Sequence, residues 1–500
     1  MSNNSTEDVQ NHEEKISEFG EETPLLVKMD DNDMKKSSVE VLVSNDSGKK
    51  FPQYLAAVSS TLGAFALGTT LAWTSPVSSS ENNYINDIMK DFTPEQIHKA
   101  WSWVGALMPL GAAIISTMIG WLLGKLGRKG TMLTLVIPFT IGWALIIKPC
   151  GIWMVYLGRL ILGMSGGAFA VAAPVYTAEI AEKEIRGALG SYFQLMVTLG
   201  ILFVYIIGGK VTAQVLSIIC GVIPLIFALI FFFMPESPEY LLSKNQENAA
   251  RKSLQFFRGK NYPVEVELNE IQSHLDKFKM EKQSLIQSFS TKAAKMSLFI
   301  SLGLMFIQQL SGVNAVIFYT GDIFKAANAD SDSNTSSIIV GVVQVVSTFI
   351  STLIVDRLGR RKLLLVSASA MSVCTLLLGV FFFLKDSNQN VDSISWVPLV
   401  SLCVFMVAFS IGFGPIPWMI LGELFSPSIK STASSIASCF NWILAFLVTK
   451  FYAPISKEAG TGVTFFIFMS ILINGAIFVS YFVKETKGKS QEEIQRELEG

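Results

Sequence analysis

Apolar residues occupy most of this chain in long segments that are separated by short polar breaks. Twelve of these segments approach the roughly 20 residues that a helix needs to cross the hydrocarbon of a bilayer. They lie at 54–78, 100–123, 131–148, 152–175, 188–209, 214–234, 295–321, 337–355, 362–384, 395–421, 431–455 and 461–483. The segments are too long and too uniformly apolar for barrel strands, so the pattern predicts membrane-spanning helices.

Arginine marks alternate breaks between the segments. The breaks "GKLGRKG" (124–130), "EIAEKEIRG" (179–187) and "DRLGRRK" (356–362) contain arginine, whereas the intervening set of breaks does not. Basic residues are retained on the cytoplasmic side, so this asymmetry predicts that the arginine-bearing breaks are cytoplasmic. An even number of spans then places both termini in the cytoplasm.

A polar segment in the middle of the chain separates six apolar segments from six. It is rich in Lys, Arg, Gln and Glu, and its stretch "ENAARKSLQFFRG" has helical composition and ends in glycine. The predicted division is a disordered acidic cytoplasmic N-terminus at 1–53, a six-helix half at 54–234, cytoplasmic linker helices at 235–294, a second six-helix half at 295–483 and a cytoplasmic tail at 484–500.

The two halves repeat one another. "GKLGRK" in the first half returns as "DRLGRR" in the second, each after the second segment, and "PESPE" is echoed by "KETKG" after the sixth. A glutamate followed seven residues later by a base occurs after each fourth segment, as Glu179 with Arg186 and as Glu423 with Lys430. Two parallel six-helix halves around a central site are the layout of the major facilitator superfamily.

Composition agrees with a membrane class and narrows the chemistry. The chain is 50% hydrophobic and 16% charged, whereas soluble domains carry about 25% charged residues. A net charge of -1 gives no indication of a nucleic-acid partner. The five cysteines are scattered through apolar segments, and no histidine lies in one, so we expect no metal site and no cofactor. The apolar segments show no buried histidine and no pair of acids of the kind that would indicate an enzyme.

Six motifs resemble those of the sugar porters, and they extend over nearly the whole chain. They are "GRLILGMSGG" (158–167), "PVYTAEIAEKEIRG" (174–187), "PESPEYLL" (235–242), "QQLSGVNAVIFY" (308–319), "DRLGRRKL" (356–363) and "GPIPWMILGELFS" (414–426). The set is similar to the facilitative hexose transporters and most similar to the insect facilitated trehalose transporters. The resemblance implies an all-α polytopic protein with twelve transmembrane helices in two six-helix pseudo-repeats, which carries a neutral sugar passively by alternating access.

Side-chain amides inside the apolar segments are the candidate sugar contacts. An amide both donates and accepts hydrogen bonds, as a sugar hydroxyl does, and polar side chains within a membrane bundle face its interior. With the resemblance, the candidates are Gln194, Gln308, Gln309, Asn314, Gln344, Trp418, Asn441 and Trp442. Gln344 stands where many hexose transporters have asparagine, and Ser410 where several have glutamate. The alternative for each lone amide is a hydrogen bond between helices.

Helix geometry constrains the cluster at 308–314. At about 100° per residue, Gln308, Gln309 and Asn314 point in three directions from a straight helix. Either one of them faces a neighbouring helix, or the helix unwinds around Ser311-Gly312, as helices do at many transporter sites. The two prolines of "GPIP" (414–417) predict a second broken span.

Charged residues gather at the predicted cytoplasmic ends of the spans. We expect them to form salt bridges that join the two halves and separate when the inner gate opens. The candidates are Glu179, Arg186, Asp356, Arg357, Arg360, Arg361, Glu423 and Lys430. The alternative is a set of basic loops that only fix the topology.

Passive uniport is favoured over proton-coupled symport. Thr70 stands in span one where proton-coupled relatives carry an acid, and we expect no Asp or Glu deep in any span. A sugar sensor that binds without transport is the third alternative, but sensors of this family carry long cytoplasmic extensions and the tail at 484–500 is short.

Two short motifs bear on localisation in the cell. Glu21 lies four residues before Leu25 and Leu26 in "EETPLL", which resembles an acidic dileucine signal that a sorting adaptor could read. Asn334 begins a glycosylation sequon in a predicted outer loop. We therefore expect a glycoprotein of the plasma membrane that cycles to endosomes or lysosomes.

Overall fold

Helices make up all the regular structure of the residues that the computed structural model describes, which are 48–78, 84–280, 289–327, 333–425, 427–489 and 491–499. The first half contains α2 (Lys50–Ala72), α3 (Thr74–Ser78), α4 (Tyr84–Asp87), α5 (Pro94–Ser116), α6 (Ile119–Leu126), α7 (Arg128–Thr134), α8 (Val136–Ile147), α9 (Ile152–Ile180), α10 (Arg186–Gly208) and α11 (Ala213–Phe231).

The linker and the second half continue the helical pattern. The linker contains α12 (Pro238–Ser243), α13 (Glu247–Arg258) and α14 (Val264–Met280). The second half contains α16 (Lys292–Leu310), α17 (Val313–Ala327), α18 (Ser333–Leu358), α19 (Arg360–Asp386), the short 3-10 turn η1 (Asp392–Ile394), α20 (Val397–Ile411), α21 (Ile416–Leu424), α22 (Pro427–Ala459) and α23 (Thr461–Phe482), and α24 (Gln491–Glu499) follows.

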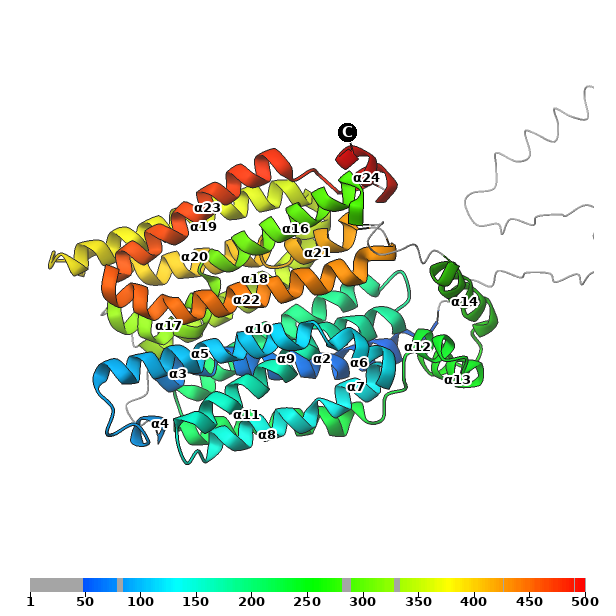
Figure 1. Cartoon of the computed structure of the whole chain (residues 1–500), viewed down its shortest axis with the longest axis horizontal. Coiled ribbons are helices and arrows are strands. Elements are labelled where there is room, and N and C mark those ends of the chain that lie inside the picture. Colours follow the sequence, from blue (N-terminus) through cyan, green and yellow to red (C-terminus); the bar gives the residue numbers. More distant parts are fainter. Residues whose placement is uncertain are drawn as a thin grey trace, which may run out of the picture. The chain divides into compact units, whose positions relative to one another are not determined.

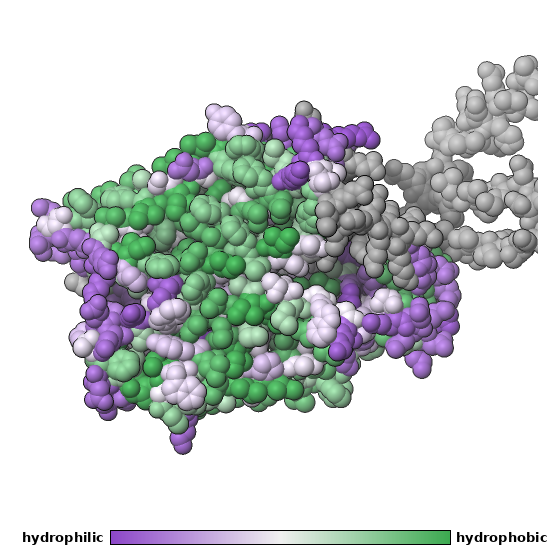
Figure 2. Space-filling model, viewed as in Figure 1, coloured by the Kyte–Doolittle hydropathy of each residue, from purple (hydrophilic) through white to green (hydrophobic). Residues whose placement is uncertain are grey.

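These helices confirm the predicted fold class. Eleven candidate spans in the described part of the chain are long and apolar enough to cross a membrane, and α5 with α6, bent by 55°, is a twelfth if it is counted as one span. The helices of the first half lie together on one side of the bundle and those of the second half on the other, with α12–α14 at one end (Figure 1). On the face shown in Figure 2, apolar side chains cover the middle of the bundle and hydrophilic ones gather at both ends.

We call the end of the bundle that carries Arg128 and Arg360 the inner end, and the opposite end the outer end. Two helix pairs join the halves along the bundle: α5 packs against α22, and α10 packs against α18. Near the outer end, α3 also packs against α17. The two halves are therefore in contact along the bundle and near its outer end.

Small residues allow the closest helix contacts within the first half. A Cβ atom on Gly163 of α9 would lie 2.0 Å from the carbonyl oxygen of Met108 in α5, and one on Gly111 of α5 would lie 2.1 Å from that of Leu160. Helices in a membrane associate through such close packing, because lipid tails offer no hydrophobic gain for burying larger apolar side chains. Gly163 and Gly167 of "GRLILGMSGG", which face Met108 and Ala112, thus have a structural role in holding α5 against α9.

Candidate functional site

Two spans of the second half are broken at the same depth in the bundle. Helix α16 ends at Leu310 and α17 begins at Val313, and Gly312 between them has a φ of +90°. Helix α20 ends at Ile411 and α21 begins at Ile416, around the "GPIP" stretch. Both predicted breaks are confirmed. Each break leaves backbone groups without their helical partners, and these groups become available to side chains.

A continuous network of side-chain amides connects the two breaks. Gln308 donates through Nε2 to the carbonyl oxygens of Phe413 (2.6 Å) and Gly414 (3.0 Å), which the second break exposes. Asn441 of α22 donates to Oε1 of Gln308 at 2.8 Å. Gln308 therefore faces a neighbouring span, and the helix is also broken at Ser311-Gly312. Both outcomes predicted from helix geometry are thus present.

The network continues on the other side of Asn441. Gln309 donates to Oδ1 of Asn441 at 2.8 Å, and Asn314 of α17 donates to Oε1 of Gln309. Gln308, Gln309 and Asn441 are 3%, 8% and 2% exposed, so their amides satisfy one another away from solvent. The arrangement is neutral and contains both donors and acceptors, so a polyol could exchange hydrogen bonds with it without any charged group being desolvated.

The other four predicted contacts lie outside this network. Gln344 of α18 is 3% exposed, and its Oε1 has no hydrogen-bond partner within the described residues. Gln194 and Trp442 are half-buried, and Trp442 packs against the apolar core. Trp418 is 40% exposed. No hydrogen bond between described residues joins any of the four to the amide network.

A buried arginine in the first half has only neutral partners. Arg159 is 0% exposed and donates to the carbonyl oxygens of Val104 (2.8 Å) and Thr70 (2.7 Å). Its third bond goes to Oγ1 of Thr74 at 3.2 Å, and Trp73 lies beneath the guanidinium at 5.5 Å. The side chain that meets Arg159 is therefore that of Thr74, whereas Thr70 contributes its backbone carbonyl oxygen. No carboxylate among the described residues pairs with Arg159.

Polar contacts join the halves near the outer end. Ser78 donates to Asp322 at 3.0 Å, and Ser75 accepts from the backbone N–H of Gly321 at 3.0 Å. Tyr205 of α10 donates to the carbonyl oxygen of Ile317 at 2.9 Å. The span that contains α16 and α17 extends to Ala327 rather than to the predicted residue 321, so Asp322 lies within its outer end. Asp322 is half-buried near the outer end of that span.

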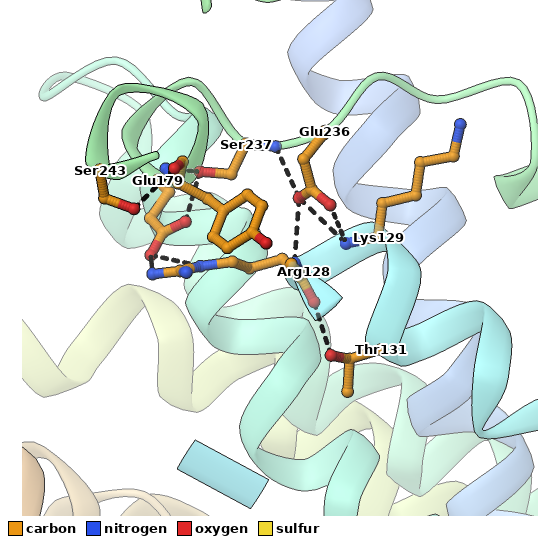
Figure 3. A network of polar contacts seen from close by, with 9 residues as sticks. Arg128, Lys129, Thr131, Glu179, Glu236, Ser237 and Ser243 are labelled. Carbon is orange, nitrogen blue, oxygen red and sulfur yellow. Dashed lines mark hydrogen bonds and ion pairs between the residues drawn. The ribbon is translucent and has the colours of Figure 1, made fainter. Parts of the chain in front are cut away.

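Charged residues at the inner end of the first half form one network (Figure 3). Arg128 at the start of α7 contacts Glu179 at the end of α9 at 2.6 Å, and Ser237 also donates to Glu179. The carboxylate of Glu236 accepts the backbone N–H groups of Arg128 and Lys129, each at 3.0 Å. A carboxylate suits the first turn of a helix, where N–H groups lack partners.

The second half repeats this arrangement. Arg360 at the start of α19 contacts Glu423 of α21 at 3.1 Å. Glu485 accepts the backbone N–H groups of Arg360 (2.8 Å) and Arg361 (3.2 Å). The pairing roles of Arg128, Glu236 and Glu485 were not predicted, although the echo of "PESPE" in "KETKG" was a signal that marked both capping glutamates.

These pairs differ from the predicted salt bridges between the halves. The Arg128–Glu179 pair lies within the first half and the Arg360–Glu423 pair within the second. In each half the arginine begins the helix that follows the second span of that half, and it lies beside the fourth span of the same half. Arg186 donates to the carbonyl oxygen of Ala181, and Arg361 to that of Ser480. The remaining candidates are Arg357 and Lys430, which are exposed, and Asp356, whose side chain lies outside the described residues.

Two spans of the second half that break around a polar network, in a bundle of two six-helix halves, are typical of secondary transporters of the major facilitator fold. The family model described as "Sugar (and other) transporter" matches residues 55–498, and the chain belongs to this family. It is therefore a multi-pass membrane protein, and the relatives it matches are named as transporters rather than enzymes.

Curated relatives from insects are similar over most of this chain. The "Facilitated trehalose transporter Tret1" of Culex quinquefasciatus is 41% identical over 453 residues, which cover 90% of this chain and 86% of that protein. The protein of the same name from Aedes aegypti is 41% identical over 451 residues, again 90% of this chain but only 55% of the relative. The chain thus spans little more than half of that relative's length.

Solved structures share the fold. The partially occluded inward open conformation of the xylose transporter XylE from E. coli matches with a TM-score of 0.74 at 22% identity, over 88% of this chain and 99% of that one. The same transporter, titled a proton:xylose symporter and bound to 6-bromo-6-deoxy-D-glucose, matches with a TM-score of 0.73 at 22% identity, over 89% of this chain and 99% of that one.

Replacing Gly312 by alanine is expected to lower the thermal stability of the protein. A Cβ atom at this positive φ would lie 2.5 Å from the ring of Phe468, and the strained backbone alone costs about 1–3 kcal/mol. Melting followed by size-exclusion chromatography in detergent measures the change. Gly190→Ala is the control, because no atom lies within 4 Å of its Cβ position. Equal melting temperatures for the two variants would contradict the assigned break.

Proposed function

We propose that this protein carries a neutral sugar, trehalose or a hexose such as glucose, passively across a membrane by alternating access. The observation that carries the proposal is the neutral amide network of Gln308, Gln309, Asn314 and Asn441 at two broken spans. The names of the insect relatives support trehalose as the first sugar to test. Gln194, Gln344, Trp418 and Trp442 are proposed as further contacts in a conformation that opens around the substrate.

The surroundings of Arg159 support passive transport. A proton-coupled carrier needs a group inside the bundle whose charge changes during the cycle. The guanidinium meets two carbonyl oxygens and the hydroxyl of Thr74, none of which titrates at physiological pH. Proton-coupled symport is the second candidate, because Asp322 is a carboxylate within a span and lies on the contact between the halves.

The contacts near the outer end support a closed outer gate in this conformation. Ser75 and Ser78 of the first half meet Gly321 and Asp322 of the second there. We propose that the inner end faces the cytoplasm, with both termini on that side, and that the ion pairs of Arg128 and Arg360 hold the inner end of each half as a rigid unit. The proposed site of action is the plasma membrane.

Two further proposals concern modification and sorting. Asn334 is half-buried, and a Cβ atom on Gly209 would fall among its side-chain atoms, so a glycan on Asn334 would require this part of the interface between the halves to open. Glu21, Leu25 and Leu26 lie outside the described residues, and their role as an adaptor signal stays a proposal from the sequence.

Uptake in expressing oocytes tests the transport proposal. We expect labelled trehalose, glucose or both to enter saturably and to stop at equilibration with the bath, because nothing in the proposed cycle binds a driving ion. A protonophore should leave the initial rate unchanged. A sugar-evoked inward current under voltage clamp that grows as the bath is acidified would overturn passive transport in favour of symport, and Asp322→Asn would then be the variant to abolish it.

A further inference from the structure

Lys450 places a cation inside an apolar span. It lies in α22, within the candidate span Thr432–Ala459, and its side chain is half-buried. Ionisable side chains inside spans are rare because their transfer from water is costly, and those that occur usually have a functional partner. No carboxylate of the described residues forms an ion pair with Lys450, so its partners must be sought among neutral groups.

Both partners of Lys450 belong to the opposite half of the protein. Its Nζ donates to Oγ of Ser102 at 2.8 Å and lies 4.0 Å from the centre of the Trp103 ring, and both residues are in α5. Ser102 is 1% exposed. Indole is the aromatic ring that binds cations best, and the hydroxyl of Ser102 accepts one N–H of the ammonium group.

Neighbouring contacts hold α22 against α5 of the first half and against α17 of the second. Phe446, one turn before Lys450, lies 6.3 Å from the Trp103 ring. Thr449 approaches to 3.0 Å the position that a Cβ on Gly105 would occupy, and its carbonyl oxygen accepts from Tyr319 at 3.1 Å. Lys450 therefore lies where α22, α17 and α5 meet, at the same end of the bundle as Ser75 and Ser78. Nearer the inner end, Ser116 and Ser438 also join α5 to α22.

We propose that Lys450 is a positioning residue of the transport cycle, which fastens the outer ends of the two halves by binding Trp103 and Ser102. The contact forms when the halves meet and breaks when they separate, because the two sides belong to different halves. A lysine head group regains water on separation, so the contact biases the population of the closed state without locking it. The inference rests on the proposed alternating-access function.

Accessibility of a reporter cysteine tests this inference without any sugar. Thr449→Cys is introduced into a Cys150→Ser background, because Cys150 is the exposed cysteine of the five. The reporter is buried between the halves and becomes accessible from outside only when the outer ends separate. Intact cells expressing each variant are labelled with a membrane-impermeant maleimide, and the labelling rate is measured.

Removing either side of the contact should raise the labelling rate. For Lys450→Met and Trp103→Leu we expect an increase between about twofold and about thirtyfold, the range that corresponds to cation–π contacts from exposed to desolvated sites. Lys450→Arg and Trp103→Phe keep a cation and a ring, so they should label nearly as slowly as the parent. The double variant, which combines Lys450→Met with Trp103→Leu, should label no faster than the faster single variant.

If Lys450→Met or Trp103→Leu folds poorly, comparison with Lys450→Arg and Trp103→Phe still tests the inference. Labelling rates that are unchanged in both disruptive variants, or that multiply in the double variant, would overturn the inference. Sugar entry and exit are measured on the same cells. Weakening the closed state should lower the half-saturating external concentration and raise the internal one. Absence of any sugar uptake by the parent would instead refute the proposed function, while the labelling rates would still decide whether Lys450 fastens the outer ends.

Discussion

Replacing Gln309 by leucine is expected to lower the initial rate of sugar uptake at least tenfold, with an unchanged amount of protein at the cell surface. Gln309 donates to Asn441 and accepts from Asn314, so its loss leaves two amide groups unpaired. A sugar hydroxyl bound at this position would be left unpaired against leucine at a cost of about 1–3 kcal/mol, and about 1.4 kcal/mol corresponds to a factor of ten in an equilibrium. Uptake of labelled trehalose or glucose per surface molecule measures the effect.

A matched glutamine outside the site provides the control. Gln214 is exposed near the outer end and donates to the carbonyl oxygen of Ile147 at 3.1 Å, so Gln214→Leu changes the same chemistry without touching the network. This variant should take up sugar at the parental rate. A well-expressed Gln309→Leu protein with normal uptake would exclude Gln309 from the sugar site.

The helices and their breaks were predictable because their causes are local. The length of each apolar segment sets a span, and "SG" at 311–312 and "GPIP" at 414–417 interrupt two of them. Helix ends were less predictable: α22 extends from Pro427 to Ala459, beyond the predicted 431–455 at both ends. Polar residues at the ends of a span can continue a helix, so hydropathy alone locates the apolar part and not the whole element.

The pairing of side chains was not predictable from local patterns. The sequence marked Gln308, Gln309 and Asn441 as polar residues in apolar spans, but which amide meets which depends on how α22 packs against α16. The direction of Gln308 toward the carbonyl groups of the second break depends on the fold in the same way. A single sequence contains no record of such contacts.

The roles proposed for Lys450 and Asp322 could not be predicted from the sequence pattern. Lys450 resembles an ordinary lysine near the end of a helix that extends toward the membrane surface, and only its position against Trp103 sets it apart. Asp322 lies one residue beyond the predicted span, and the continuation of α17 to Ala327 brings it inside. Both residues were visible in the sequence, but the functional reading of each depends on contacts with the other half.

Replacing Glu179 by alanine is expected to destabilise the protein more than the equivalent change at Glu423. Glu179 and its partner Arg128 are 9% and 18% exposed, whereas Glu423 and Arg360 are 28% and 11% exposed. Removing one member of a buried pair costs about 3–5 kcal/mol, because the other charge stays buried without compensation. A more exposed pair is partly screened by water, so its loss should cost less.

The repeat of the fold makes these two variants a matched comparison. Each glutamate pairs with the arginine that begins the helix after the second span of its own half, so the type of contact is the same and mainly burial differs. Glu179 also accepts from Ser237, which ties the start of the linker to the first half and adds a second lost contact. The melting temperature in detergent should drop by several degrees for Glu179→Ala and by less for Glu423→Ala. Glu179→Gln keeps hydrogen-bonding atoms but no charge, so its melting temperature should lie between those of the parent and Glu179→Ala. Equal shifts for the two alanine variants would show that burial does not decide the strength of these pairs, and that the inner ends of the halves are held by other contacts.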